Sequence, residues 1–317
     1  MKNLITILMC AIVRCGICSD AAQPQHVADN AGESSSLAVA EPPELPLPQI
    51  PATLRTPAER AGYLINHFWD GMNFSDIRMS HDRMFMEQNF STFISVFPHA
   101  DESARRTAVG RLLKKAEADA EAYSLVTDIA EKYLYETDSP VYSEEYYILF
   151  LENIVESKVL GEYGTMRTRW QLETARKNRP GMTAADFGYT TPDGKNTTLG
   201  KTPVRDYLLV VFYDPTCDHC KEVMRELQND SGLASCMADG RLTVLAIYSG
   251  DNRDMWRKGL GELPAGWRVG FESGEMQENG IYVLRMMPTL YLLDSNRRVL
   301  IKEATPQQVV QRVCGGE

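Results

Sequence analysis

Through residues 56–178, apolar side chains recur at the spacing that places them on one face of a helix. Thr56 and Glu59, on either side of Pro57, form a capping box, which predicts that the first helix starts there. The first apolar face consists of Ala61, Leu64, Ile65, Phe68 and Met72, and further helices are predicted at 81–97, 102–123, 125–135, 144–155 and 165–177. Residues 56–178 are therefore predicted to form an all-α domain of about six helices.

The aromatic and methionine residues of this domain have two interpretations, a ligand groove or a packing core. They are Phe68, Trp69, Met84, Phe85, Met86, Tyr146, Tyr147 and Phe150. A packing core is the preferred interpretation because these residues fall at helical spacing. His67, His81 and His99 are isolated from one another in the sequence, and no nucleophile–base or metal set stands out in the domain.

After residue 178 the apolar residues form short runs separated by turn signals. Residues 191–194, with the sequence Thr-Pro-Asp-Gly, are typical of a hairpin turn. The continuous apolar run at 207–213 predicts a strand buried on both faces. Other strands are predicted at 242–248, 289–293 and 299–303, and helices at 217–228, 253–259 and 305–313, with a short segment around 267–271 left unassigned. This alternation predicts an α/β domain over residues 182–317, with a central mixed sheet covered by helices on both faces.

The chain begins with features of a secretion signal. Lys2 precedes the apolar segment 4–13, which is too short to span a bilayer, so residues 1–20 are predicted to be a signal peptide or a lipoprotein signal. Cleavage after Ala21 and lipid attachment at Cys18 both stay open. Either route predicts export to the periplasm or cell envelope, where disulfides persist. Residues 21–55 are polar and rich in proline, which predicts a flexible linker.

Length and charge narrow the function classes. At 317 residues the chain is long enough for two domains, and its net charge of −10 argues against a nucleic-acid or anionic-membrane surface. No segment after the signal is apolar enough to predict a transmembrane helix. The remaining composition is that of an ordinary globular protein, so candidate chemistry must come from particular residues.

Cys217 and Cys220 lie where the buried strand passes into a helix. Pro215 ends the strand, and Cys217 falls at the helix start, where free amide groups and the helix dipole favour a reactive thiolate. Cys220 is on the same helix face, close enough for an intramolecular disulfide. The alternatives are half of a zinc site and a non-catalytic disulfide. Zinc needs four ligands, however, and the other pair at this spacing, Cys15 and Cys18, lies in the targeting segment.

Three motifs together make residues 182–317 resemble the thioredoxin superfamily, in the branch of extracytoplasmic thiol–disulfide oxidoreductases of the TlpA and ResA type. The motifs are Ala185-Asp186-Phe187 with Asp193-Gly194, the segment 212–220 with its cysteine pair, and the segment 287–294, which begins Met287-Pro288. Proline is otherwise rare in strands, and in the family a cis proline at this place faces the cysteines. The helical region resembles N-terminal domains of uncharacterised function that precede thioredoxin folds in some envelope proteins.

The resemblance implies a thioredoxin-like fold that exchanges disulfides with protein thiols or disulfides. Cys217 would be the attacking thiolate and Cys220 the resolving thiol, with no cofactor and no metal. Pro288, Met287 and Thr216 would shape the groove in which a partner's backbone docks. A membrane redox partner would recharge the cysteine pair.

The residues around the cysteines depart from thioredoxin itself. Asp218 and His219 replace Gly-Pro between the cysteines. A positive imidazole at His219 is typical of oxidising members, whereas Asp218 acts in the opposite sense, so the direction of electron flow stays open. Val211 stands where thioredoxin has a buried acid, and Asp214 and Glu222 are alternative bases for the resolving thiol by proximity only.

Two alternative functions and a further cysteine pair also need to be considered. A thiol peroxidase would carry a threonine or serine three residues, and a proline seven residues, before the reactive cysteine, where this chain has Asp214 and Val210. A client-binding scaffold with an incidental redox pair would not need both cysteines and Pro288. Cys236 and Cys314, on elements expected to cover the same sheet face, either pair as a second disulfide or stay free thiols.

Overall fold

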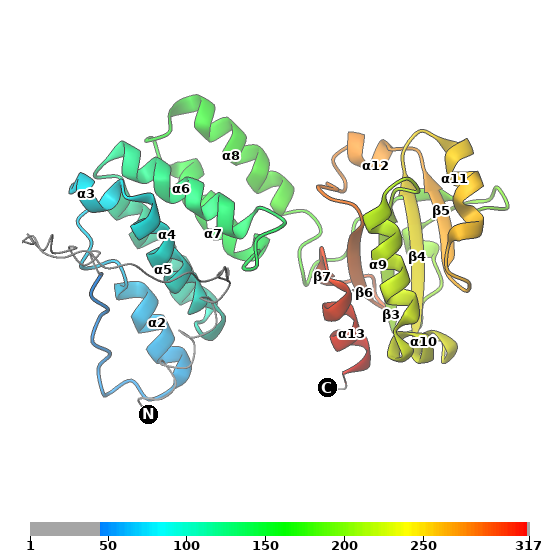
Figure 1. Cartoon of the computed structure of the whole chain (residues 1–317), viewed down its shortest axis with the longest axis horizontal. Helices are drawn as coiled ribbons and strands as arrows, with labels where there is room; N and C mark the ends of the chain where they lie inside the picture. Colours follow the sequence, from blue (N-terminus) through cyan, green and yellow to red (C-terminus); the bar gives the residue numbers. More distant parts are fainter. Residues whose placement is uncertain (1–44, 316–317) are drawn as a thin grey trace, which may run out of the picture. The chain divides into compact units, whose positions relative to one another are not determined.

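The computed structural model describes residues 45–315, in which a run of helices is followed by a seven-stranded sheet with its own helices (Figure 1). The predicted fold class, an all-α region followed by an α/β region with a mixed sheet, is confirmed. We call residues 57–175 the helical half and residues 182–315 the sheet half. The predicted signal at 1–20, lipid attachment at Cys18 and most of the predicted linker at 21–55 lie outside the described residues.

The helical half is built from helices whose first turns are mostly capped by side chains. The helices are α2 (Pro57–His67), α3 (Ile77–Ser80), α4 (Arg83–Ser95), α5 (Glu102–Ala116), α6 (Ala120–Leu134), α7 (Glu144–Glu156) and α8 (Gly161–Ala175). In the predicted capping box, the Thr56 hydroxyl accepts from the Glu59 amide and the Glu59 carboxylate accepts from the Thr56 amide. Side chains of Asp82, Asp101, Asp119 and Ser143 likewise cap α4, α5, α6 and α7. Each cap satisfies an amide that has no partner within its helix.

Several boundaries differ from those predicted. The predicted break near residue 124 lies instead at 117–119, because Asp119 caps α6. The predicted helix 81–97 begins only at Arg83, because Asp82 caps it. The short helix α3, which precedes that cap, is missing from the prediction, and α8 begins before residue 165. Leu45 is buried in the helical core, so the end of the predicted flexible linker at 21–55 is packed.

Aromatic rings dominate the core of the helical half. Phe68, Phe90, Phe93 and Phe97 are each at most 1% exposed, and the ring centroids of Phe93 and Phe97 lie 4.9 Å apart in an edge-on arrangement. This burial confirms the packing-core interpretation of the aromatic residues. Met84 is the exception, because its side chain is 79% exposed and belongs to the surface of α4.

The sheet has the strand order β2-β1-β5-β4-β3-β6-β7. Its strands are β1 (Gly188–Thr190), β2 (Asn196–Thr198), β3 (Tyr207–Tyr213), β4 (Leu242–Ser249), β5 (Arg268–Glu272), β6 (Thr289–Asp294) and β7 (Val299–Lys302). Its helices are α9 (Asp218–Asn229), α10 (Ser231–Ala238), α11 (Arg253–Gly259), α12 (Glu275–Glu278) and α13 (Pro306–Cys314). β3 runs parallel to β4 and antiparallel to β6, so the sheet is mixed. The sequence prediction lacked α10 and α12, which are too short to show a clear helical period.

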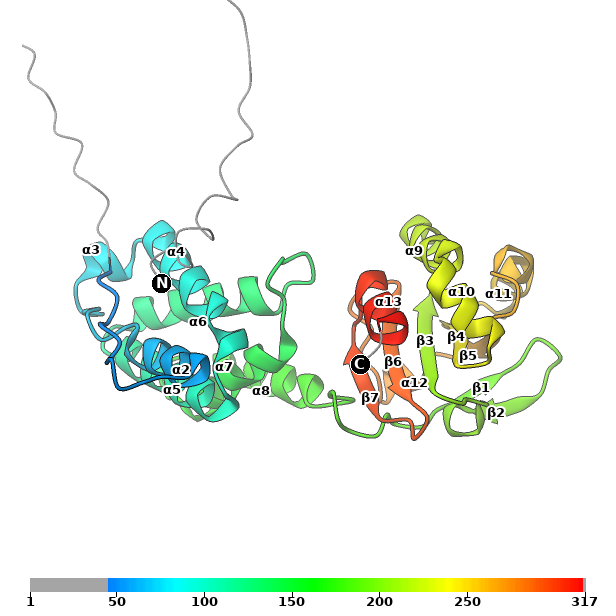
Figure 2. The same cartoon turned by 90° about the horizontal axis from the view of Figure 1, so that it is seen from below.

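Side chains of β3 alternate between two cores, one on each face of the sheet. Leu209, Val211 and Tyr213 belong to one core, and Leu208, Val210 and Phe212 belong to the other. Helices α9, α10 and α13 lie together on one side of the strands, which Figure 2 shows from below. Short α12 and non-helical segments supply the second core, so the two faces are covered unequally.

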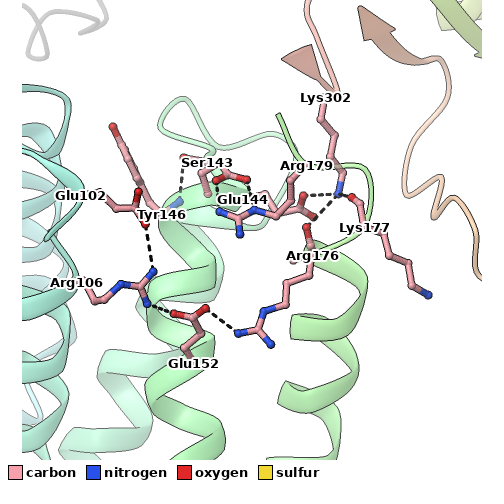
Figure 3. A network of polar contacts seen from close by, with 12 residues as sticks. Glu102, Arg106, Ser143, Glu144, Tyr146, Glu152, Arg176, Lys177, Arg179 and Lys302 are labelled. Carbon is pink, nitrogen blue, oxygen red and sulfur yellow. Dashed lines mark hydrogen bonds and ion pairs between the residues drawn. The ribbon is translucent and has the colours of Figure 1, made fainter. Parts of the chain in front are cut away.

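Polar contacts connect the helical half with the last strands of the sheet half (Figure 3). Lys302 of β7 forms an ion pair with Glu144 at 2.5 Å and donates to a backbone carbonyl just after α8. Glu152 of α7 bridges Arg106 of α5 and Arg176, the C-cap of α8. The first turn of α7 is therefore held by the sheet half, and its later part is held by Arg106 and Arg176.

A second contact centres on Arg285, in the segment that leads to β6. Its guanidinium bonds the Glu303 carboxylate and the Tyr142 hydroxyl, donates to the Tyr135 carbonyl and lies 4.0 Å over the Tyr135 ring. The side chains of Arg285 and Glu303 are only 14% and 4% exposed, so removing Arg285 would leave the buried Glu303 carboxylate without its cation. Through Arg285, this contact reaches the segment that also carries Pro288.

Candidate active site

Cys217 occupies the N-cap of α9, immediately after the turn that leaves β3. Its sulfur accepts a hydrogen bond from the Cys220 amide at 3.2 Å. The Asp214 carboxylate holds the turn by accepting bonds from the amide and hydroxyl of Thr216 at 2.7 and 2.6 Å. A sulfur at a helix N-cap meets free amide groups and the positive end of the helix dipole, both of which stabilise negative charge.

Cys220 differs from Cys217 in its exposure. Cys220 is 0% exposed, whereas Cys217 is partly accessible to solvent. Burial is the main cause that raises the pKa of the Cys220 thiol to about 12, and the neighbouring sulfur of Cys217 adds to it. The outer sulfur can therefore meet a partner, while the inner sulfur stays protonated behind it.

The peptide between Met287 and Pro288 is cis, and β6 begins at the next residue. The Met287 carbonyl oxygen lies 3.7 Å from the Cys217 sulfur. In the pairing of β6 with β3, Thr289 lies opposite Phe212, which brings the proline beside the end of β3 and the start of α9. The structure thus brings both cysteines and the cis proline into one place.

The two residues between the cysteines point into solvent. The Asp218 side chain is 95% exposed, with the Lys221 ammonium 3.9 Å away. The His219 side chain is 60% exposed, with its Nδ1 3.8 Å from Glu222. Water screens charges at such exposure, so neither Asp218 nor His219 has a dominant electrostatic effect at the buried sulfur.

Neither carboxylate that proximity in sequence suggested as a base for Cys220 forms a hydrogen bond with its sulfur within residues 45–315, although the charge of Asp214 contributes to the raised pKa of this thiol. Oδ1 of Asp214 accepts both bonds from Thr216, and Glu222 is 69% exposed beside His219. Val211, at the position of the acid in thioredoxin, is buried among apolar residues.

Two buried polar side chains in the core that contains Cys220 were not expected from the sequence. The Tyr213 hydroxyl and the Trp256 indole N–H are both buried in this core. Burial is the main cause that raises the pKa of Tyr213 above its ordinary value, whereas the nearby Trp256 indole lowers this pKa. Both residues occur in apolar runs or faces, so no sequence signal distinguished them from packing residues.

A groove of about 690 Å³ lies beside the cis proline. The sheet half contributes His219, Pro288 and Leu290 to its lining, and the helical half contributes residues between 137 and 145. Its volume is typical of ligand-binding clefts. Met287 and Thr216, predicted to contact substrate, are not part of this lining. Their observed contacts are with the Cys217 sulfur and with the Asp214 turn.

A metal site needs clustered ligands, and a membrane span needs a long apolar helix. Within 45–315, no three side chains of His, Cys, Asp or Glu gather in a way that could hold a metal ion. In the same part of the chain, no helix combines the length and apolar character needed to cross a membrane.

Similarity to known proteins extends over both halves. Residues 18–178 match the family described as Domain of unknown function (DUF5106). The crystal structure of a thioredoxin-like protein from Bacteroides caccae is 33% identical, with a TM-score of 0.81 over 86% of this chain and 99% of that chain. The C-terminal domain of an uncharacterized protein from Bacteroides fragilis is 36% identical over 43% of this chain and 97% of that chain, with a TM-score of 0.41. No curated protein matches the sequence.

The match to the Bacteroides caccae protein covers nearly all of that protein and joins the two halves in one alignment. The DUF5106 match covers the helical half together with the residues before it. The chain therefore belongs to the thioredoxin-like proteins, and its helical half belongs to the family of unknown function DUF5106.

Proposed function

We propose that this chain is an exported thiol–disulfide oxidoreductase that exchanges disulfides with protein cysteines through Cys217 and Cys220. The position of Cys217 carries the proposal. Its sulfur accepts from the Cys220 amide and lies 3.7 Å from the Met287 carbonyl, next to the cis Pro288. A thiolate at this place is stabilised by the helix start and open to a partner, while a second thiol is buried behind it.

Reduction of a client disulfide takes two exchange steps. The Cys217 thiolate attacks one client sulfur, forms a mixed disulfide and releases the other client sulfur as a thiolate. Cys220 then loses its proton and attacks the Cys217 sulfur, which releases the second client thiol and leaves a Cys217–Cys220 disulfide. The client gains two electrons from the cysteine pair. One client thiolate takes the Cys220 proton, and the other takes from water the proton that Cys217 released when it ionised. Oxidation of a client dithiol is the same sequence in reverse.

The proton on Cys220 governs the second step. Burial raises the pKa of this thiol to about 12, and neither Asp214 nor Glu222 forms a hydrogen bond with it. The client thiolate released in the first step is then the base at hand, because it forms beside the mixed disulfide. We therefore propose that the Cys220 proton passes to the client, which needs no dedicated acid at position 211.

Client docking uses the groove beside Pro288. Proline has no N–H, so it leaves the backbone edge before β6 free to pair with an extended client segment. Met287 and Thr216 would contact that segment close to the reactive sulfur, and Asp218 and His219 would meet it from the helix start. Residues 137–145 line the same groove, which supports a role for the helical half in the choice of client.

Export and recharging complete the proposal. The apolar segment at 4–13 after Lys2 supports export to the periplasm or cell envelope, with lipid at Cys18 or cleavage after Ala21. A membrane redox partner would return the cysteine pair to its working state after each exchange. Mass spectrometry of the mature N-terminus tests this part, and an intact Met1 on the abundant cellular form would contradict it.

The decisive experiment traps the mixed disulfide. Cys220→Ser removes the resolving thiol, so complexes through Cys217 should persist and appear as discrete higher-mass bands that disappear on reduction. The matched control is the double variant Cys217→Ser/Cys220→Ser, which should trap nothing. If the single variant traps only small thiols, the exchange function with proteins is wrong. Non-reducible capture of partners by both variants would favour the client-binding scaffold instead.

A further inference from the structure

A second cysteine pair lies at the other end of the same sheet face. Cys236 belongs to α10 and Cys314 is the last residue of α13, and these two helices pack against each other. The two sulfurs are 3.9 Å apart although 78 residues separate them in the sequence. Thiols that approach this closely across a fold need only small side-chain rotations to form a bond.

The packing around Cys314 leaves room for this approach. A Cβ atom added at Gly232 of α10 would lie 3.0 Å from the Cys314 sulfur and 3.3 Å from its Cβ. A larger residue at 232 would therefore push the end of α13 away from α10. Glycine here allows the close contact that brings the two sulfurs together.

The two thiols have different surroundings. Cys236 is 2% exposed, and its sulfur lies 2.8 Å from the Arg241 guanidinium, which can only donate hydrogen bonds and stays charged. Cys314 is partly accessible, and burial is the main cause that raises its pKa to about 11. An external oxidant can thus reach Cys314, while a cation stabilises negative charge on the sulfur behind it.

We propose that Cys236 and Cys314 form a second disulfide that ties the C-terminal helix to α10 and takes no part in client exchange. The Cys314 thiolate attacks a small external disulfide such as oxidised glutathione, forms a mixed disulfide and releases one thiolate. Cys236, whose sulfur lies beside the Arg241 guanidinium, then gives up its proton and attacks the Cys314 sulfur, which releases the second thiolate. The external disulfide gains two electrons, and the two thiolates that it becomes take up the protons that Cys314 and Cys236 give up on ionising. The new disulfide has lost these electrons and protons.

This disulfide would hold in place a helix that the reactive site depends on. α13 contributes Val309 and Val313 to the same core that contains Cys220. Because the bond would close a loop of 78 residues, it would restrict the unfolded chain strongly and so favour the folded one. Its persistence rests on the proposed export to an oxidising compartment, but its formation can be tested apart from that.

The test uses the full-length mature protein in the background Cys217→Ser/Cys220→Ser, so that the first pair cannot contribute. After exposure to oxidised glutathione, peptide mapping without reductant should find residue 236 linked to residue 314. The additional change Cys314→Ala should abolish that linked peptide. Alkylation of both Cys236 and Cys314 in the oxidised protein, which would mean two free thiols, overturns the proposal.

Thermal unfolding gives a second readout. Oxidised protein should unfold roughly 5–15 °C higher than its Cys314→Ala variant, and reduction should close most of the gap. Cys236→Ala should lower the midpoint by a similar amount, and the double alanine variant should lose little more. Equal midpoints before and after reduction would contradict the proposal.

Two further variants test the role of Arg241 in closing the disulfide. Arg241→Gln should slow closure of the disulfide several-fold at neutral pH, and Arg241→Lys should restore most of the rate, whereas a purely structural role would leave the rate unchanged. Client trapping by Cys220→Ser separates this inference from the proposed function. If trapping fails while the 236–314 peptide is found, the exchange function is wrong and the second disulfide stands; the opposite pair of results rejects only the second disulfide.

Discussion

The helical half contains no cysteine, whereas the sheet half holds all four cysteines within residues 45–315. Aromatic rings fill the core of the helical half, and its charged side chains pair with one another at the surface or at the contact with the sheet half. In the sheet half, the apolar core on one face of β3 contains a thiol, Cys220. Substitutions in the first half should therefore act mainly through packing, and substitutions in the second through the chemistry of one sulfur.

The contact between the halves contains groups that could affect both the stability of the fold and disulfide exchange. Glu144, Arg285 and Glu303 are all buried and paired, and Arg285 lies close in sequence to Pro288. Variants in each half, and then at this contact, show how far stability and exchange are separate.

The largest expected effect is on activity alone. Cys217→Ser should reduce disulfide exchange with insulin to background, a loss of at least about a thousandfold, because the hydroxyl is a far weaker nucleophile than the thiolate. Serine is a good N-cap residue, so α9 should keep its start and the free energy of unfolding should change by less than about 1 kcal/mol. Insulin turbidity and urea unfolding measure the two quantities.

Cys314→Ala is the matched control for loss of a thiol elsewhere in the sheet half. It should keep exchange activity, measured below its unfolding transition. Substantial activity in Cys217→Ser would contradict the assignment of Cys217 as the reactive residue, because the exchange would then depend on another sulfur.

The next effect is on stability alone. Phe93 is fully buried among the rings of Phe68, Trp69, Phe90 and Phe97, so Phe93→Ala should cost about 3–5 kcal/mol of unfolding free energy. At temperatures where the variant is folded, its kcat for insulin reduction should match that of the unchanged protein. Met84→Ala, at an exposed position of the same helix, should cost less than about 0.5 kcal/mol. A fall in kcat for folded Phe93→Ala would show that the two halves are coupled.

Local signals predicted the elements that frame the site. The apolar run 207–213 became β3 without change, because a strand buried on both faces needs continuous apolar residues. The helix start at Cys217 was predicted from Pro215 and the pattern that follows it, and a proline before an apolar run marked Pro288. Each of these features depends on neighbouring residues, which is why one sequence was enough.

Features that depend on distant residues could not be predicted in the same way. The 3.9 Å approach of Cys236 and Cys314 follows from packing of α10 against α13, and α10 was itself missing from the prediction. Glu144 looked like an ordinary acidic residue in the first turn of a helix, yet Lys302 and the sheet half bury it. The groove lining at 137–145 likewise exists only because both halves meet beside Pro288.

The smallest expected effect concerns pH and the contact between the halves. Burial is the main cause that raises the pKa of Glu144 to about 7, and it outweighs the opposing ion pair with Lys302. The folded protein therefore binds this proton more tightly than the unfolded chain does. The stability that the protonated Glu144 contributes is fully present below about pH 4.5 and is lost as the pH rises to about 7.

Glu144→Gln should remove this dependence, because glutamine does not titrate. The unfolding free energy of the variant, relative to that of the unchanged protein, should rise by about 1–3 kcal/mol between pH 5 and pH 8. Urea unfolding of both proteins at several pH values measures the difference. Glu145→Gln, one residue along α7 with a side chain that is 39% exposed, controls for loss of a glutamate at this helix start. A difference that stays constant with pH would mean that Glu144 is already ionised in the folded protein, with Lys302 compensating its burial. The contact between the halves would then be an ion pair at every physiological pH, and the separation of stability from exchange would hold without regard to pH.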